Sequence, residues 1–187
     1  ANLTVLTGDL GTGTNTSRII QKTFAGAAVL DGFTVRDGLG PGTAHDGAGL
    51  HQTAGTLELA DVIFTNNSSG RHGGAIYVSG GSTFLSISNC TFANNDNAAN
   101  AALGDGGAIY VHSAIGAFAL ADCRFESNLS DDDGGDIYVS TATIDIEIQN
   151  CTFVGSRASG TGGEGGSIYS FNDGSHTFKN CSFRDTA

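Results

Sequence analysis

Acidic residues and one histidine recur at one position of a sequence repeat. That position lies directly before a glycine, which begins a short Gly-rich segment. Carboxylates stacked at equal spacing repel one another unless a cation or a hydrogen bond compensates. Two interpretations stay open: each carboxylate accepts a backbone N–H bond in its own Asp-Gly turn, or Ca²⁺, which prefers oxygen ligands, bridges neighbouring repeats. The residues at this position are Asp46, His72, Asp105, Asp133 and Glu164. Calcium is the only cofactor that the sequence suggests, and its candidate ligands are Asp105, Asp131, Asp132 and Asp133.

Cysteine occupies a second recurring position, inside the motif (N/D)-C-x-F. If the repeats stack at strand spacing, neighbouring cysteines have Cα atoms about 4.8 Å apart, inside the disulfide range of roughly 4.4–6.8 Å. Parallel strands hold their Cβ atoms side by side, however, which is wider than the ~3.8 Å that a disulfide prefers. Free buried thiols and a Cys90–Cys123 disulfide both stay open, and a metal site is disfavoured because no CxxC or nearby histidine completes a ligand set. The four cysteines are Cys90, Cys123, Cys151 and Cys181.

Tyrosine occupies a third position and no other, in segments such as "GGAIYV". Because the flanking Ile and Val must fill the core, we expect the tyrosines to project outward from one flat sheet, with His51 as a surface residue extending their row. An exposed aromatic strip is typical of a binding face for sugars, proteins or neighbouring rods. Alternatively, cross-strand stacking only stabilises the sheet, by about 0.2–1 kcal/mol per pair. The residues are Tyr77, Tyr110, Tyr138 and Tyr169.

Three short strands per repeat are needed to position these columns. The phenylalanines from Phe64 onward are separated by 28, 33, 28 and 30 residues, which indicates stacked supersecondary units. Within each unit, Leu85 and Ile87 and their equivalents alternate with polar residues, and the alternation then slips by one residue at an Asn or Asp that tolerates left-handed backbone. The pattern predicts an all-β, single-stranded parallel β-helix, or β-solenoid, of about six coils of roughly 30 residues. The bend residues are Asn89, Asp122, Asn150 and Asn180.

The repeat motifs resemble those of a known family. "GGAI" at 73–76 and 106–109 and "FTNN", "FANN" and "FESN", starting at Phe64, Phe92 and Phe125, are similar to the GGA(I/L/V) and FxxN repeats of chlamydial polymorphic outer-membrane proteins. The resemblance implies a right-handed β-helix, export to the cell surface, and a role as adhesin or surface scaffold. The sequence departs from the pattern where "GGDI" and "GGSI" replace GGAI and where "FVGS" and "FRDT" lack the Asn.

Length and charge indicate a single β-helix domain over residues 1–187, with an irregular first coil (1–26), regular coils (27–175) and a partial last coil (176–187). The net charge of −11 disfavours nucleic acid as a partner. No apolar run reaches the ~20 residues that span a bilayer, so no transmembrane segment is expected. The resemblance implies an extracellular or cell-surface protein, and because no leader pattern is visible we expect the leader to have been removed.

Catalysis would require converging outward carboxylates, but the candidates Glu58, Asp136, Asp145 and Glu147 are scattered. We therefore expect a non-enzymatic structural or adhesin-like surface protein. The alternative is a polysaccharide-binding or polysaccharide-degrading module. The chain shows no amphipathic helix to cap the strand edges at its ends, so we expect self-association, end to end into a filament or laterally, besides contacts with surface glycans or host or cell proteins.

Overall fold

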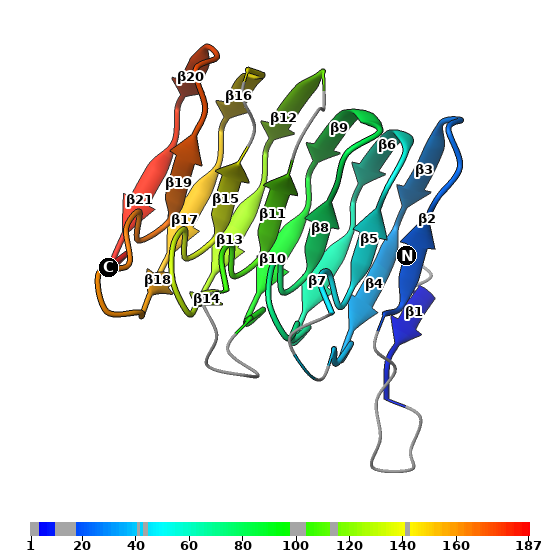
Figure 1. Ribbon diagram of the computed structural model, residues 1–187, viewed down its shortest axis with the longest axis horizontal. Helices are drawn as coiled ribbons and strands as arrows, with labels where there is room; N and C mark the ends of the chain where they lie inside the picture. The colour runs from blue at the N-terminus through cyan, green and yellow to red at the C-terminus, as the bar shows by residue number, and fades with distance from the viewer. Residues whose placement is uncertain are drawn as a thin grey trace.

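A computed structural model describes residues 4–9, 18–40, 42, 45–97, 104–112, 116–140 and 143–187. The chain forms a rod of stacked coils, and the coils follow one another from the N-terminus at one end of the rod to the C-terminus at the other (Figure 1). Each regular coil contributes one strand to each of three parallel sheets. Residues 1–3 and 10–17 of the expected first coil lie outside the described residues.

The first sheet, here called the phenylalanine sheet, has seven strands. They are β1 (Thr4–Thr7), β4 (Phe33–Arg36), β7 (Ile63–Thr65), β10 (Thr91–Ala93), β13 (Arg124–Glu126), β17 (Thr152–Val154) and β21 (Ser182–Arg184).

The second, the tyrosine sheet, has six strands. They are β2 (Ile20–Lys22), β5 (Leu50–Gln52), β8 (Ile76–Val78), β11 (Ile109–His112), β15 (Ile137–Ser140) and β19 (Ile168–Phe171).

The third, the long-strand sheet, also has six strands. They are β3 (Ala28–Asp31), β6 (Gly55–Ala60), β9 (Ser82–Ser88), β12 (Ala117–Ala121), β16 (Asp145–Gln149) and β20 (His176–Lys179). A short pair, β14 (Leu129–Ser130) with β18 (Arg157–Ala158), lies in the connection between the phenylalanine and tyrosine sheets.

Pairing is parallel throughout, and equivalent residues of successive coils are partners. Phe92 pairs with Phe64 and Phe125, for example, and Tyr110 pairs with Tyr77 and Tyr138. The predicted all-β parallel β-helix is confirmed. Among the described residues, no helix is long and apolar enough to cross a membrane.

The core is built from identical or similar side chains stacked along the rod. Phe64, Phe92, Phe125 and Phe153 are fully buried, and neighbouring rings lie nearly parallel with centroids 4.8–5.2 Å apart. In the long-strand sheet, the equivalent inward column is Leu59, Ile87, Leu120 and Ile148. Each side chain therefore buries its apolar surface mainly against its counterparts in the coils before and after it.

The predicted bends lie between the long-strand and phenylalanine sheets. Asn89, Asp122, Asn150 and Asn180 have φ of 51–56°, a left-handed conformation that costs most L-residues about 1–2 kcal/mol but suits Asn and Asp. Their side chains also contact one another along the rod: Asn150 Nδ2 donates to Asp122 Oδ1 at 3.0 Å, and Asn180 Nδ2 donates to Asn150 Oδ1 at 3.2 Å.

A second left-handed bend, which the sequence analysis did not predict, follows the phenylalanine sheet. It lies at Asn66, Asn94, Ser127 and Asp185, with φ of 54–55°. The residue after each of the first three bends points inward. The FxxN motif therefore supplies two buried residues: a phenylalanine that packs in the core and an asparagine that directly follows a turn.

Candidate functional site

The column that precedes the glycines forms a continuous ladder of hydrogen bonds. The side chain of each member accepts the backbone N–H of the equivalent residue in the next coil: Asp46 from His72 at 3.2 Å, and His72 from Asp105 at 3.2 Å. Asp105 accepts from Asp133 at 3.3 Å, and Asp133 accepts from Glu164 at 2.7 Å. Hydrogen bonds from backbone N–H groups therefore offset the repulsion between the stacked carboxylates. One interpretation predicted that these N–H groups would come from the residue's own Asp-Gly turn, whereas they come from the following coil. We call this set the acceptor ladder.

His72 takes a carboxylate's place in the acceptor ladder. Its Nδ1 accepts the Asp105 N–H, which requires a neutral ring with the proton on Nε2. Burial lowers the pKa of His72 to about 4, in keeping with that role. The 3.4 Å approach of His72 Nδ1 to Asp105 Oδ2 is therefore a contact between a neutral ring and a carboxylate at neutral pH. Asp46, at the start of the ladder, is held by both Nε and Nη2 of Arg71, at 3.0 and 2.9 Å.

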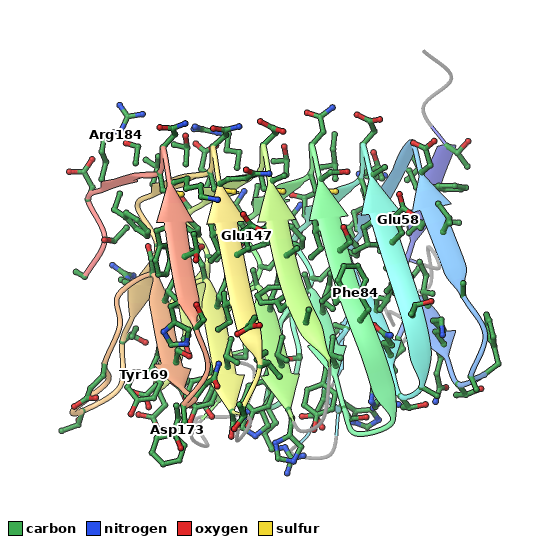
Figure 2. The ribbon with its side chains drawn as sticks, turned by 90° about the horizontal axis from the view of Figure 1, so that it is seen from above. Glu58, Phe84, Glu147, Tyr169, Asp173 and Arg184 are labelled. Carbon is green, nitrogen blue, oxygen red and sulfur yellow. The ribbon has the colours of Figure 1, made fainter. Side chains whose placement is uncertain are left out.

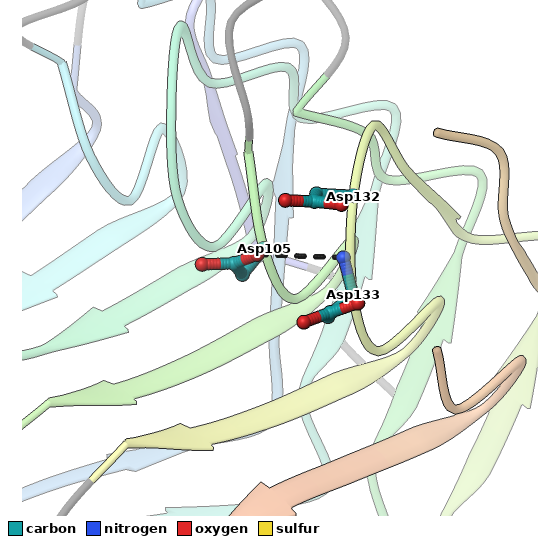
Figure 3. Close-up of side chains that lie close together, drawn as sticks. All are labelled: Asp105, Asp132 and Asp133. Carbon is teal, nitrogen blue, oxygen red and sulfur yellow. Dashed lines mark hydrogen bonds between the residues drawn. The ribbon is translucent and has the colours of Figure 1, made fainter. Parts of the chain in front are cut away.

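Three of the four candidate calcium ligands lie together (Figure 3). One carboxylate oxygen each from Asp105, Asp132 and Asp133 lies within 4.8 Å of the other two, whereas Asp131 is not part of this group. Burial, followed by the charges of Asp132 and Asp133, raises the pKa of Asp105 to about 6 despite the N–H bond from Asp133. Burial, followed by the charges of Asp133 and Asp131, also raises the pKa of Asp132. The arrangement supplies oxygen ligands from two successive coils, the set that a hard cation prefers, and calcium binding there stays a prediction.

The tyrosine column is stacked, but it is not the exposed strip that the sequence analysis predicted. Neighbouring rings lie 5.0–5.4 Å apart and within 5–16° of parallel. Tyr77 and Tyr110 are only 8% and 6% exposed, while Tyr138 and Tyr169 are half-buried. Since each ring face inside the column lies against another tyrosine, few faces are left on which a sugar could stack.

The acceptor ladder lies beside the tyrosine column, and its histidine covers part of that column. The His72 ring stacks on Tyr110 at 4.4 Å, and burial with the charge of Asp46 raises the pKa of Tyr77 to about 12. The glycine after each ladder residue lets the chain approach this closely. Gly73 has φ of +59°, and a Cβ there would lie 2.1 Å from the carbonyl oxygen of Ile76. Sequence reasoning treated the acidic and tyrosine columns as separate, whereas the fold places one directly against the other.

His51 extends the tyrosine row, as predicted, but it is not a surface residue. Its ring contacts Tyr77 edge-on at 4.9 Å, and both ring nitrogens are buried with no hydrogen-bond partner in the part of the chain that the structure describes. Burial, together with the charge of Arg18, lowers the pKa of His51 to about 4, so the ring is neutral at physiological pH.

The buried asparagines form a second ladder, which the sequence analysis missed although it noted the FxxN motif. Asn95 Oδ1 accepts both the backbone N–H and Nδ2 of Asn67, at 3.1 and 3.0 Å, and Asn95 Nδ2 donates to Asn128 Oδ1 and to Phe64 O, each at 3.1 Å. The amide oxygens and nitrogens thereby satisfy buried backbone groups at the second bend. A repeated Asn three residues after a core Phe was the available signal.

Asp136 lies in this ladder, and its expected outward position is wrong. It is fully buried in the alanine position of GGAI, where Asn128 Nδ2 donates to its Oδ1 at 2.8 Å. The asparagine ladder ends at Asn128, because Ser156 stands at the next Asn position: its Oγ accepts the backbone N–H of Asn128 at 3.1 Å, and the Asn128 side-chain amide donates to Asp136 instead. The segments "GGDI" and "FVGS" both depart from the repeat motifs, and the two departures compensate for each other. Asp136 of the first accepts from the Asn128 side chain, which an Asn in the second would otherwise do. Burial raises the pKa of Asp136 to about 7 although neighbouring side-chain donors lower it, and among the described residues neither Asp136 Oδ2 nor Ser167 Oγ has a hydrogen-bond partner.

The cysteines stack inward as free thiols in this structure, with Cys90, Cys123 and Cys151 buried and Cys181 half-buried. Each thiol donates to the carbonyl oxygen two residues before it, as Cys151 Sγ does to Gln149 O at 3.2 Å. Hydrogen bonding to Cys123 and burial raise the pKa of the Cys151 thiol, which disfavours the nucleophilic thiolate.

The remaining outward carboxylates do not converge. Glu58 and Glu147 stand on separate strands of the long-strand sheet (Figure 2), and Glu147 pairs with Lys179 at 3.0 Å. Asp145 accepts the backbone N–H of Ser175 at 3.2 Å. Arg124 lies in the phenylalanine sheet and pairs with Glu126 of its own strand.

Comparison with known proteins agrees with this geometry. Residues 61–79 match the sequence model of the Chlamydia polymorphic membrane protein (Chlamydia_PMP) repeat. The matched segment begins at Asp61, whose φ of 54° is that of the bend before the phenylalanine sheet, and also contains strand β7, Asn67 of the asparagine ladder, His72 of the acceptor ladder, and strand β8. No curated protein and no solved structure gave a match. The repeat match and the stacked parallel sheets fit a surface β-helix protein whose repeats are like those of the polymorphic membrane proteins of Chlamydia.

Proposed function

We propose that this β-helix is a stiff, non-enzymatic rod of a surface protein, located outside the cell after removal of a leader, and that its flat side serves as an adhesive face. One observation supports the structural part most directly. The recurring polar side chains of the acceptor and asparagine ladders form hydrogen bonds between neighbouring coils, each with the equivalent residue of the next coil. Side chains committed in this way hold successive coils in register and make the rod resist bending.

The outer face of the long-strand sheet supports the adhesive part. It is broad, and small side chains, among them Ser86 and Ala119, occupy its middle. Phe84 is 36% exposed on it (Figure 2), and Val29, on strand β3 at one end of the sheet, is 64% exposed. Flat surfaces of mixed small, apolar and charged side chains suit contact with host or cell proteins, since little backbone or side-chain entropy is lost when a rigid sheet docks.

A polysaccharide-binding or polysaccharide-degrading role is the second candidate. It is favoured by Glu58 and Glu147, which face outward on the same sheet as Phe84. The stacked and largely buried tyrosines, however, offer such a ligand fewer aromatic faces than the sequence suggested.

An adhesion assay separates the two. Beads coated with the folded protein are added to cultured epithelial cells before and after enzymatic removal of surface glycans. We expect binding to survive glycan removal and to fall several-fold with Phe84→Asp. Ile63→Asp, a matched change at a residue 38% exposed on the phenylalanine sheet, should leave binding unchanged.

Three results would overturn the adhesive proposal. Binding no stronger than that of uncoated beads would remove the adhesive role, and binding lost with the glycans would favour the polysaccharide-binding alternative. Release of new reducing ends from purified polysaccharides would identify an enzyme.

A further inference from the structure

The inward cysteine column holds three buried thiols at equal intervals in the middle of the rod, those of Cys90, Cys123 and Cys151. Each cysteine directly precedes a strand of the phenylalanine sheet, and the residues that follow the three cysteines are partners in the parallel register. The backbone also joins neighbouring members: Cys90 O accepts the Arg124 N–H and Cys123 O accepts the Thr152 N–H, each at 2.9 Å. The column therefore repeats by translation from one coil to the next.

The three side chains have the same orientation. Each thiol donates to the carbonyl oxygen two residues before it, at 3.2 Å for Cys90, 3.1 Å for Cys123 and 3.2 Å for Cys151. Translation by one coil moves every atom of a residue by the same distance, so neighbouring sulfur atoms lie about 4.8 Å apart, as their Cα atoms do. The Cys123 thiol interacts with the thiols on both sides of it, in keeping with this spacing.

A disulfide fits this spacing poorly, because its two sulfur atoms lie only about 2.05 Å apart. To form one, both side chains would have to leave the orientation in which they bond to carbonyl oxygens. A soft metal ion between two thiolates requires no such movement. Metal–sulfur bonds are about 2.3 Å long, as for zinc, so two bonds on opposite sides of an ion span about 4.6 Å.

The surroundings of the column favour an ion with only two ligands. The sequence disfavoured a metal site because it completes no four-ligand set, but a soft monovalent ion such as Cu(I) prefers thiolates and is satisfied by two of them. Among the described residues, no further His, Cys, Asp or Glu side chain converges with a pair of these thiols. The adjacent inward columns are apolar and buried, so they exclude the water molecules that would otherwise add ligands.

Cys90 and Cys123 are the pair best suited to hold such an ion. A Cu(I) ion with two thiolates carries one net negative charge, which a buried site has to offset. The backbone N–H of Val62 donates to Cys90 Sγ at 3.4 Å and supplies part of that compensation. Cys90 and Cys123 also directly follow exposed bend residues, Asn89 and Asp122, so one residue separates each thiol from the surface.

We propose that Cys90 and Cys123 bind one soft monovalent cation, Cu(I), as a linear dithiolate that joins two successive coils. Both thiols lose their protons to solvent on binding, so one ion replaces two protons and no electron is transferred. Because the two sulfur atoms are held at this spacing only when the coils are stacked, the ion stabilises the folded protein. This site is independent of the adhesive face, which lies on the outside of the long-strand sheet.

Copper binding under anaerobic conditions tests the site. The protein used carries Cys151→Ser and Cys181→Ser, so that it contains only the proposed pair and lacks the half-buried Cys181, which could bind copper adventitiously. Cu(I) is supplied as its complex with a coloured chelator, and X-ray absorption identifies the atoms bound to the metal. We expect one Cu(I) per chain with two sulfur neighbours and no nitrogen or oxygen neighbour, and a melting temperature above that of the copper-free protein.

Cys90→Val in the same protein is the matched control. Valine already occupies the equivalent position of the preceding coil, where Val62 is buried, so this variant should fold, as circular dichroism can establish. We expect it to lose both copper binding and the rise in melting temperature. Cys123→Ser tests the second ligand independently, because its hydroxyl can still donate to the carbonyl oxygen that the thiol contacts.

Three results would overturn the proposal. The first is copper that either single-cysteine variant retains as tightly as the pair does. The second is a pair protein that cannot take copper from the chelator, or that binds it through nitrogen or oxygen. The third is a Cys90–Cys123 disulfide in the folded protein, since it would show that the sulfur atoms approach more closely than the ion requires.

Discussion

Asp136→Asn is expected to stabilise the protein at neutral and alkaline pH. In the folded chain, burial raises the pKa of Asp136 from its ordinary 3.8 to about 7. Below about pH 4 the carboxyl is protonated in both states and has no effect. Between about pH 4 and pH 7 the carboxyl is ionised in the unfolded state but still protonated in the folded state, so the free energy of unfolding falls as pH rises. Above about pH 7 it falls no further, because the carboxyl is ionised in both states. The difference between the two pKa values corresponds to roughly 4 kcal/mol.

Asparagine removes this loss without disturbing the ladder. Its Oδ1 can still accept from Asn128, and its Nδ2 provides a donor where Asp136 Oδ2 and Ser167 Oγ lack partners. Urea unfolding at pH 4 and pH 8 measures the effect, and coincident circular dichroism and tyrosine fluorescence transitions establish that a two-state treatment applies. We expect the variant to be within about 1 kcal/mol of the parent at pH 4 and up to roughly 4 kcal/mol more stable at pH 8.

The exposed Asp173→Asn is the matched control, and because its side chain lies at the surface it should change the free energy of unfolding by less than about 0.5 kcal/mol at either pH. A variant equally or less stable than the parent at pH 8 would refute the reasoning, since it would mean that Asp136 is ionised in the folded protein without a cost. The double variant Asp136→Ala with Ser156→Asn extends the test. It restores the residues that occupy these positions in earlier coils, so it should be more stable than the sum of its single changes predicts.

Three further predictions follow from the ladders. Asn95→Ala should lower the free energy of unfolding by about 3 kcal/mol or more, because it leaves several buried polar groups without partners, whereas the neighbouring exposed Asn94→Ala should cost about 1 kcal/mol; equal losses in denaturant unfolding would contradict the ladder. Millimolar Ca²⁺ should raise the melting temperature and Mg²⁺ should not, with the shift lost in Asp132→Asn; an unchanged melting temperature would argue against a calcium site. A thiol reagent should modify Cys181 alone in the folded protein, because the other three thiols are buried; mass spectrometry that finds disulfides, or several modified thiols, would show otherwise.

The fold could be predicted from the sequence because a β-solenoid is determined locally. The alternation of apolar and polar residues identifies the strands. An Asn or Asp at the point where this alternation shifts by one residue identifies a bend, as at Asn89. A fixed repeat then makes each coil's environment a copy of its neighbour's, so that the column positions follow from the register. The second bend, at Asn66 and its equivalents, was missed because its sequence changes from Asn to Ser, Gly and Asp along the chain.

What the sequence could not determine is which column lies against which. The tyrosines were assigned correctly to one outward row, but their burial depends on the loop that carries the acceptor ladder folding back over the strand. That path is set by backbone contacts such as the close approach of Gly73 to Ile76.

Asp136 illustrates the same limit. Its residue type and alternation allowed an outward carboxylate, whereas its partner Asn128 and the missing asparagine at Ser156 become neighbours only when successive coils stack. The sequence by itself therefore determined the repeat, the strands and the column to which each residue belongs, because those depend on local periodicity. Only the tertiary structure decided burial, hydrogen-bond partners and ionisation, because those depend on contacts between columns and between coils about thirty residues apart.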